Sequence, residues 1–583
     1  MTSPFFGLDI ATRALRTQQT LVDIANQNIA NANTPGYSRQ SGNVRATRAY
    51  PAPAFNAGVQ PGQLGTGVEV STVTRARDTF ADFQIRGQYA EQGRWDARKD
   101  ALAQMESVIN EPSSSGTSSQ LSKFWQTWQE LANSPSDPSA RVAVVQQGQA
   151  LAQALNTSSQ LLRQQQRDLD SQVGLTLTSI NNYAQQISQL NTQISQAEAG
   201  RMHANDLRDQ RDLLVDKLSQ LVKVNTTESP DGQLSLYING HQLVDRDRVH
   251  ELLGNSSPGP FTTVAWKDDG STLDTTSVGG QLQGLTESRD SEVQGQLNQL
   301  NQLASRVIQS VNSIHTSGVG LDGKGGQPFF DGTDATTIVV DPVLTSPNGT
   351  SHVAAARMYV DPNSPSGYSS ATGDSSNALA LANLQTGVGQ LATTSMVRPG
   401  TSYSGPPGAT VLGVDTSQAA PNSTISIAVS GGAVTFTNGT STVAGTVTVG
   451  SDANGNQIIT VDGGSLGIRL TLSAGSGSSV NGVLANLNGQ SASTQAAPAT
   501  IGAQYSQVIA ALGVASTTAQ SQSSNQQVLI KQLDRQRQDT SGVSLDEEAT
   551  QLIQYQRAYE AAARVISVSD SMLDTLINHT GAG

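Results

Sequence analysis

Cysteine is absent from this 583-residue chain, and aromatic and charged residues are scarce, at 4% and 14% of the sequence. No stretch approaches the ~20 consecutive apolar residues of a membrane-spanning helix. Lysine and arginine number 34 against 47 aspartate and glutamate residues, which gives a net charge of -13. Binding to nucleic-acid phosphates needs clustered positive charge, so neither a nucleic acid nor a membrane is expected as a partner.

The lack of cysteine also bears on where the chain works. A cytosolic protein of this size usually keeps some thiols, whereas an exported protein that functions without disulfides needs none. The first ten residues, MTSPFFGLDI, contain no lysine or arginine, and no apolar signal segment follows them. A cleaved secretory signal is therefore not expected, and composition alone leaves both compartments open.

A heptad of apolar residues runs through the N-terminal segment, at Leu8, Leu15, Val22 and Ile29. The companion positions hold mostly alanine and glutamine, so the pattern predicts a helix of about 25 residues with a narrow apolar seam. A turn is expected to end this helix, because proline removes a donor and glycine permits the bend. The turn residues are Asn31, Asn33, Thr34, Pro35, Gly36 and Tyr37.

The C-terminal segment carries a matching heptad. Its seam positions are Leu545, Leu552, Tyr559, Ile566 and Leu573, with Tyr555 at a companion position. Ser544 followed by Glu547 predicts a capping box that opens this helix. Each stripe taken singly also fits an ordinary amphipathic helix on a globular core. Two narrow seams at the two ends are marginal as an isolated pair, so we expect them to pack with each other and with other subunits.

Between the ends the pattern alternates between helical and strand-like segments. The predicted fold is mainly α with β-rich insertions, in which the terminal helices pair as a coiled-coil-like stalk, a helical bundle forms the centre and β-rich domains lie outside. The expected segments are an N-terminal helix (1–40), a helical bundle with short β segments (41–222), a β-rich segment (223–280), a helical return (281–330), an outer β-rich insertion (331–500), a second helical return (501–540) and the C-terminal helix (541–583).

The clearest part of the insertion is 399–500, which contains only four charged residues and alternates strongly between apolar and small polar residues. This pattern predicts a sandwich or a small barrel. A disordered linker rich in glycine, serine and threonine is the alternative.

Three clusters carry a family resemblance. Residues 28–40 read NIANANTPGYSRQ, residues 541–559 begin SGVSLDEEA and end YQRAY, and the runs 205–212 and 311–330 lie between them. The first two clusters resemble the N- and C-terminal signatures of the flagellar rod, hook and hook-associated proteins. With all three in order, the chain most resembles the hook-associated proteins of the first type, which form the hook–filament junction. The resemblance covers roughly 1–335 and 500–578, and leaves 399–500 without a counterpart.

The resemblance implies a structural subunit of the bacterial flagellum, exported unfolded through the flagellar type III apparatus and extracellular at the hook–filament junction. Its implied partners are copies of itself in a ring, the hook protein, a second junction protein that leads to the flagellin filament, and an export chaperone on the C-terminal segment. The implied fold is layered, with terminal helices lining an inner tube and β domains facing outward.

Patterns that could suggest an active site have plainer interpretations. The G-x-S-x-G match at 463–467 is followed by strand-like alternation rather than a helix, and the six histidines lack metal-ligand spacing. The acidic cluster at 203–212 fits a helix N-terminus with Arg208 and Arg211 in local ion pairs, and 322–326 fits a tight turn better than a calcium loop. We expect no catalytic residue, cofactor or metal.

Two other functions remain open from the sequence. A hook or distal rod subunit shares the terminal signatures, although the length and the runs at 205–212 and 311–330 argue against it. An adhesin-like or peptidoglycan-acting accessory would use 399–500 as its binding or catalytic module.

Overall fold

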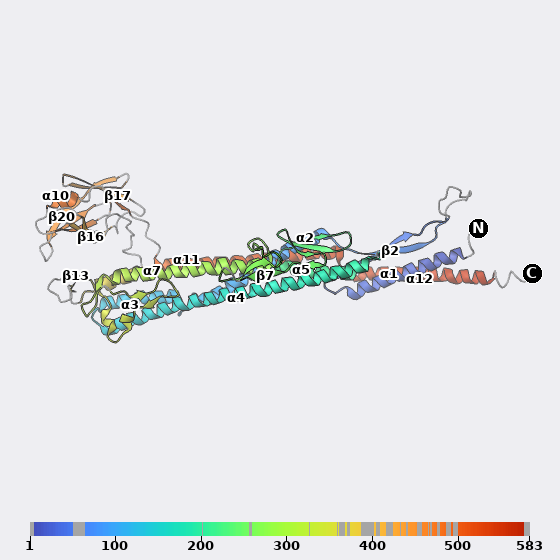
Figure 1. Cartoon of the computed structure of the whole chain (residues 1–583), viewed down its shortest axis with the longest axis horizontal. Coiled ribbons are helices and arrows are strands. Elements are labelled where there is room, and N and C mark those ends of the chain that lie inside the picture. Colours follow the sequence, from blue (N-terminus) through green and yellow to red (C-terminus); the bar gives the residue numbers. More distant parts are fainter. Residues whose placement is uncertain are drawn as a thin grey trace, which may run out of the picture. The chain divides into compact units, whose positions relative to one another are not determined.

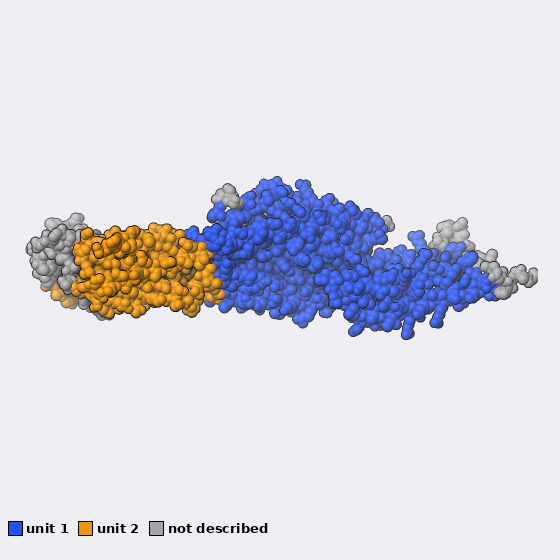
Figure 2. Space-filling view, turned by 90° about the horizontal axis from the view of Figure 1, so that it is seen from below, with its two compact units in different colours: residues 1–105, 163–295, 514–583 blue, residues 106–162, 296–513 orange. Residues whose placement is uncertain are grey.

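The structure is a computed structural model of the chain. It describes residues 5–575 except 51–63, 201, 256–258, 326, 358, 361–367, 370–372, 386–401, 404–408, 416–423, 432, 439–440, 452–456, 464–465, 467–468, 475–478, 486–490 and 494–499. The chain divides into two compact units (Figure 2). Unit 1 comprises 1–105, 163–295 and 514–583, and unit 2 comprises 106–162 and 296–513.

The described residues are mainly helical, which confirms the predicted fold class. The α-helices are α1 (Phe6–Asn31), α2 (Thr79–Ile109), α3 (Thr117–Asn133), α4 (Pro138–Glu198), α5 (Asn205–Leu221), α6 (Gly280–Glu287), α7 (Gln294–His315), α8 (Pro342–Thr345), α9 (Ser376–Ala382), α10 (Val480–Ala485), α11 (Ile501–Ser541) and α12 (Leu545–Asp574). A π-helix, η1 (Ser288–Val293), links α6 to α7, and the short 3-10 helices are η2 (Gly349–His352) and η3 (Asn383–Gln385). No described helix is long and apolar enough to cross a membrane.

In unit 1 a two-stranded antiparallel hairpin accompanies the terminal helices. Its strands are β1 (Gln40–Ala46) and β2 (Val68–Arg75), and they pack against α1. The sequence pattern predicts these short β segments within the helical bundle segment 41–222, whereas β1 and β2 contact α1. The turn at Gly36, with φ of 81°, directs the chain back along α1, so the hairpin packs on the helix that precedes it.

A second β region of unit 1 follows α5. A four-stranded antiparallel sheet contains β3 (Asn225–Glu228), β4 (Leu234–Ile238), β5 (His241–Asp245) and β6 (Arg248–Val249), and a hairpin contains β7 (Leu252–Asn255) and β8 (Thr263–Trp266). Asn239 and Gly240 join β4 to β5 with φ of 48° and 87°, the positive values that a tight hairpin turn needs.

Unit 2 has an aromatic core. Phe124 and Trp128 of α3 pack against Phe329, with ring centroids 5.6 Å and 5.4 Å from it. α7 ends at His315 and the chain then enters short strands, so the predicted helical return over 281–330 is helical only in its first part. Beyond His315 the backbone pairs with another segment instead, since Gly318 and Val319 form β9 opposite Ala356 and Arg357.

The remaining strands belong to unit 2. Short pairs join β9 (Gly318–Val319) to β12 (Ala356–Arg357), β10 (Phe330–Asp331) to β11 (Val339–Val340), and β13 (Tyr359–Val360) to β14 (Tyr368–Ser369). One antiparallel sheet has the order β15 (Ser402–Tyr403), β16 (Ala409–Asp415), β22 (Arg469–Ala474), β21 (Gln457–Asp462) and β20 (Thr446–Ser451). The other has the order β19 (Ser441–Ala444), β18 (Ala433–Asn438), β17 (Thr424–Ser430) and β23 (Ser491–Ser493).

These two larger sheets share a core. A Cβ on Gly445 would lie 2.7 Å from the ring of Phe436 on β18 and 2.9 Å from Val461 on β21. Both side chains are fully buried, so the stretch folds as a sandwich rather than as a linker. Most of the G-x-S-x-G match lies outside the described residues.

Candidate functional site

The terminal helices α1 and α12 lie side by side in unit 1 (Figure 1). Most α12 positions turned away from solvent follow spacings of three and four residues, as in a coiled coil. They are Glu548, Leu552, Tyr555, Ala558, Ala562, Ile566, Ser569 and Leu573, and Gln551 and Ala563 beside them are also half-buried. Among the predicted seam residues, Leu552, Tyr555, Ile566 and Leu573 are half-buried, whereas Leu545 and Tyr559 stay exposed, at 52% and 37%. The Ser544 hydroxyl caps α12 as predicted, by accepting from the Glu547 N–H at 3.5 Å.

On α1 the buried face is displaced from the predicted seam. Leu8, Leu15, Val22 and Ile29 are only half-buried, and the fully buried residues are Ala11, Thr17, Leu21, Ala25 and Asn28. The hairpin explains the shift, because the Thr17 hydroxyl donates to the Val68 carbonyl at 3.0 Å. A Cβ on Gly42 of β1 would lie 2.8 Å from Leu21, so hairpin and helix are in direct contact.

A second apolar stripe on α12 is left open to solvent. It consists of Ala561, Val565, Val568 and Met572, again spaced by three and four residues. Val565, Val568 and Met572 are 50%, 59% and 68% exposed. At 100° per residue this stripe lies about 120° around the helix from the face that meets α1. α12 therefore has two apolar faces, of which the chain covers one.

The predicted turn is closed by one buried amide, Asn28. Its nitrogen donates to the Gln40 carbonyl at 2.9 Å and to the Glu548 carboxylate at 3.0 Å. Its oxygen accepts from the Tyr37 hydroxyl and from the Gln40 N–H, both at 2.9 Å. Every hydrogen-bonding position of the amide is filled, so the end of α1, the turn and the start of α12 are held at one side chain.

The other residues of the predicted turn set its local conformation. The Thr34 hydroxyl donates to the Asn31 side-chain oxygen at 3.1 Å, and Asn33, Thr34 and Pro35 are exposed. Gly36 has φ of 81°, and a Cβ there would lie 3.1 Å from Leu213 of α5. Only glycine fits both the backbone conformation and this approach to α5.

Glu548 is the counterpart of Asn28 on α12, and it is 1% exposed. The Arg39 guanidinium donates to Glu548 at 2.7 Å and lies 3.3 Å from Glu547. The Arg39 N–H also donates to the Ser541 carbonyl at 2.8 Å. The residue before β1 is thereby tied to the end of α11 and to the first turn of α12.

Three aspartates on one face of α5 lie next to this turn, and each pairs with an arginine from another element. They are Asp209, Asp212 and Asp216. Asp209 accepts from the Ser38 N–H at 2.9 Å and from Arg75 at 2.7 Å. Asp212 accepts from Arg75 at 3.0 Å.

The third aspartate, Asp216, accepts from Arg86 at 2.8 Å and from Arg537 of α11 at 2.7 Å. The spacing of the aspartates by three and four residues places them on one helix face. This ladder joins β2, α2, α5 and α11 beneath the predicted turn.

Burial and charge act against each other in this ladder. Burial opposes the charged form of Asp212, but the attraction of Arg77, Arg86 and Arg75 outweighs it and lowers the pKa of Asp212 to about 2. Burial, assisted by Asp206, Asp209 and Glu548, raises the pKa of Tyr37 above its ordinary range. Asp212 is therefore an anion and Tyr37 a neutral donor at physiological pH.

The pairs expected within the 203–212 cluster are wrong, although α5 does begin at Asn205. Arg208 binds Glu198 at 2.7 Å, and Arg211 donates to the Gly232 carbonyl at 2.7 Å. The carboxylates of α5 bind distant arginines instead, because the fold returns β2, α2 and α11 to their face. A signal was present in the sequence, since three aspartates on a buried helix face need cationic partners. The described residues contain no metal-binding group of histidines and carboxylates.

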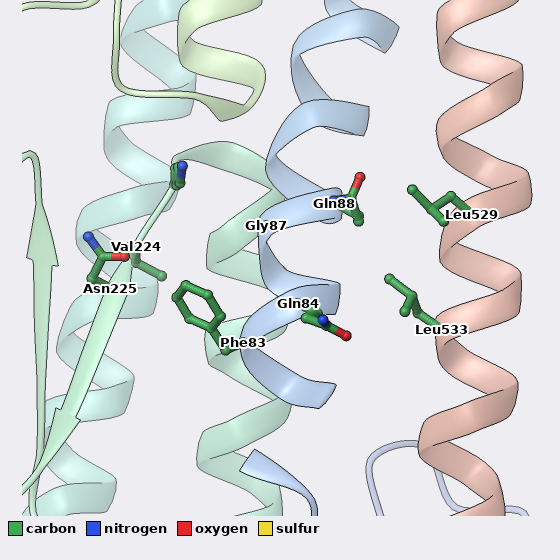
Figure 3. Close-up of a pocket in the computed structure, with 9 residues that line it drawn as sticks. Phe83, Gln84, Gly87, Gln88, Val224, Asn225, Leu529 and Leu533 are labelled. Atoms are coloured by element: carbon green, nitrogen blue, oxygen red, sulfur yellow. The ribbon is translucent and has the colours of Figure 1, made fainter. Parts of the chain in front are cut away.

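A separate apolar hollow of about 400 Å³ opens between α2 and α11 in unit 1 (Figure 3). Phe83 and Gly87 of α2 line one side, and Leu529 and Leu533 of α11 line the other. Phe83 is 61% exposed, which is unusual for a phenylalanine. This surface adds to the apolar area available for packing against another protein.

The chain is similar over its full length to curated flagellar proteins. It is 30% identical to "Flagellar hook-associated protein 1" of Bacillus subtilis (strain 168) over 619 residues, covering 100% of both chains. The chain belongs to the flagellar hook-associated protein 1 family. Its member in Escherichia coli (strain K12) is 28% identical, with 97% of this chain and 98% of that protein covered.

Family models match three parts of the chain. The model described as "Flagellar hook-associated protein FlgK helical domain" matches 102–330. Two rod models match only the ends: "Flagella basal body rod protein" at 8–37 and "Flagellar basal body rod FlgEFG protein C-terminal" at 536–579. The alternative that the chain is a hook or distal rod subunit is therefore supported only by the two ends of the sequence.

A solved structure agrees in fold. The flagellar hook junction protein FlgK from Burkholderia pseudomallei matches with a TM-score of 0.50 and 21% identity, covering 79% of this chain and 100% of that one. Members of this family are structural proteins of the flagellum and not enzymes. The chain is accordingly a structural flagellar component that assembles with other axial proteins.

Proposed function

We propose that the chain is the junction subunit that joins the hook to the filament and polymerises through its terminal helices. Its neighbours are copies of itself in a ring, the hook protein, and a second junction protein that leads to the flagellin filament. The β-rich region within 331–500 faces outward, and the assembled protein is extracellular.

The open apolar stripe of α12 supports this proposal most directly. Val565, Val568 and Met572 expose apolar side chains at coiled-coil spacing on a helix that already packs against α1. An exposed apolar stripe on a helix whose other apolar face is already packed marks a surface that binds another protein. Leu545 and Tyr559, which stay exposed in the single chain, are further contacts for neighbouring subunits.

The two seams can be tested separately in cells that lack the native chain and carry variants. Leu552→Asp with Ile566→Asp breaks the face toward α1, and Val565→Asp with Val568→Asp breaks the open stripe. Each pair should abolish filament attachment, seen by electron microscopy and by loss of swimming. Gln554→Asp with Gln556→Asp changes exposed polar residues of the same helix and should leave attachment intact. Normal swimming by both seam variants would refute polymerisation through these helices.

Export is part of the same proposal. The chain passes unfolded through the flagellar type III apparatus while a chaperone holds the C-terminal segment. Terminal helices with narrow seams and the absence of cysteine support passage as an unfolded chain. A chain without 545–583 should no longer be recovered with the chaperone from the cytoplasm, whereas one without 399–500 should be. Equal recovery of both would exclude the C-terminal segment as the binding site.

A further inference from the structure

The apolar hollow between α2 and α11 has walls that are tied together at both of its ends. At one end the Arg537 guanidinium of α11 lies 3.7 Å from Asp82 of α2, and at the other the Ser523 hydroxyl donates to Asp96 at 2.5 Å. These ties are about 14 residues apart on each helix, which leaves about 21 Å of groove between them. The chain therefore forms this groove by itself, before any partner binds.

The lining of the groove is apolar and nearly free of charge. Phe83 and Leu529 face it and are 61% and 38% exposed, and Lys223 is the one charged residue among its described lining residues. Phe80, which lies one turn before Phe83 on α2, is 65% exposed as well. Exposed aromatic side chains beside an apolar groove mark a surface that another protein covers.

The open stripe of α12 matches this groove in length and in character. From Ala561 to Met572 the stripe is about 17 Å long, so it fits between the two ties. The charged residues of the same span, Arg564 and Asp570, project about 70° and about 170° from its midline. A helix with such a stripe can lie in the groove between two other helices.

The other grooves of unit 1 are poorer acceptors for an uncharged stripe. The groove between α1 and β2 is lined by Arg13, Arg16 and Glu69. An apolar helix would remove water from these charges without supplying partners for them. The groove between α4 and α5 is lined by glutamines as well as leucines, and their amides would lose hydrogen bonds to water in the same way.

The stripe cannot reach the groove of its own chain. No residue of α12 that the structure describes lines the groove, and α12 runs on beyond the end of α11 beside α1 (Figure 1). Leu533 lies about 12 Å before the end of α11, and the stripe begins about 24 Å after the start of α12. The two surfaces are therefore about 36 Å apart along the helices, and only a second molecule can bring them together.

We infer that the groove between α2 and α11 receives the open stripe of α12 from a second copy of the chain. This inference rests on the proposed polymerisation through the terminal helices, and it names the acceptor surface. The contact joins two different surfaces of identical chains, so it is head-to-tail and continues from subunit to subunit.

Two variants of the acceptor test this pairing in cells that lack the native chain. Phe83→Asp places a charge in the groove, and Gly87→Met fills it with a side chain from α2. Each should lower the number of attached filaments by about tenfold or more. Neither purified chain should unfold at a lower urea concentration than wild type, because Phe83 is already exposed and a Cβ on Gly87 meets nothing within 4 Å.

Ala103→Asp is the matched control, because it adds the same charge at an exposed position of α2 outside the groove. It should leave attachment intact. Normal attachment in either acceptor variant overturns the inference. If the Val565→Asp and Val568→Asp variant still loses its filaments in that case, polymerisation through α12 stands with a different acceptor. Normal attachment in that variant as well would refute both.

Cross-linking gives a second readout, made simple by the absence of native cysteine. A chain with Gln88→Cys and Val565→Cys should give a ladder of multimers when isolated hook–filament structures are treated with a short bismaleimide. Either cysteine alone should give only monomer. A chain with Gln189→Cys and Val565→Cys should also stay monomeric, because Gln189 lines the groove between α4 and α5. Multimers from these controls, or none from the first chain, overturn the inference.

Discussion

A few buried polar residues determine where the ends of this chain meet its middle. The side-chain amide of Asn28 bonds to both the predicted turn and α12. The Glu548 carboxylate accepts hydrogen bonds from that amide and from Arg39. Such residues contribute little when their partners are present and cost much when a partner is lost, because the remaining group stays buried without compensation. The effects of substitutions here should therefore be large and specific.

Asn28→Asp should loosen the contact between α1 and α12 by about 2–4 kcal/mol. The substitution keeps the shape but removes two donors and sets a second carboxylate against Glu548. In isolated hook–filament structures, where neighbours protect the terminal helices, hydrogen exchange of α12 amides should accelerate while exchange in α5 stays unchanged. Asn31→Asp is the control, because the Asn31 nitrogen donates only to the Gln27 carbonyl within its own helix. Equal exchange in wild type and Asn28→Asp would show that the amide does not hold the two helices.

His315 makes unit 2 sensitive to acid. It is fully buried, its Nδ1 donates to the Gln327 carbonyl at 2.6 Å, and its Nε2 accepts from the Ala354 N–H at 3.0 Å. These bonds require the neutral ring. Burial, with a further contribution from Arg141, lowers the pKa of His315 to about 4 against an ordinary 6.5, although the Gln327 bond and Asp341 oppose the shift.

The unfolded chain therefore binds a proton at His315 below about pH 6.5, and the folded chain does so only below about pH 4. Stability of unit 2 should be constant above pH 7 and should fall by about 2 kcal/mol by pH 5. Urea unfolding at the two pH values, followed by protection of α3 and α7 amides, measures the change. His315→Gln should remove most of this pH dependence, and an unchanged slope would exclude His315 as its source.

At the scale of elements, unit 1 depends on close helix approaches that leave no room for a side chain. A Cβ on Gly93 of α2 would lie 2.0 Å from the Gln220 carbonyl oxygen, and one on Gly284 of α6 would lie 2.4 Å from the Arg94 carbonyl oxygen. Backbone atoms cannot yield as a flexible side chain can. The three helices α2, α5 and α6 are therefore held at a spacing that glycine alone permits.

Gly93→Ala should destabilise unit 1 by about 3 kcal/mol or more, because α2 would have to move away from α5. Gly87→Ala is the matched control in the same helix, since a Cβ there meets nothing within 4 Å. That control should be neutral or stabilising by about 0.5–1 kcal/mol, because alanine favours the helix. Urea midpoints of the two variants give the comparison, and equal midpoints would refute the close approach.

At the scale of the whole molecule, the two ends are basic and acidic respectively, and both lie in unit 1. Their helices bury narrow seams, and α12 keeps a second apolar stripe exposed. Covering that stripe needs a neighbouring chain, so the stability of the ends should depend on assembly.

Hydrogen exchange on the purified monomer should be fast for 1–35 and 545–575 and slow for α5 and α7. The same terminal segments should become protected in isolated hook–filament structures, because neighbours then cover them. A chain carrying Val565→Asp and Val568→Asp should not gain this protection. Slow exchange at both ends of the monomer would mean that α1, α12 and the hairpin already form a stable core without partners.

The sequence by itself determined the fold class, the two terminal helices, the Ser544 cap and the family, because heptad spacing, turn chemistry and end signatures are local. It did not determine which side of α1 is buried, since the hairpin that covers Leu21 is placed by tertiary packing. It also missed the partners of Asp209, Asp212 and Asp216, which lie on segments far away in the chain. Only the tertiary structure decided those contacts, because periodicity reports that a face is buried but not what covers it.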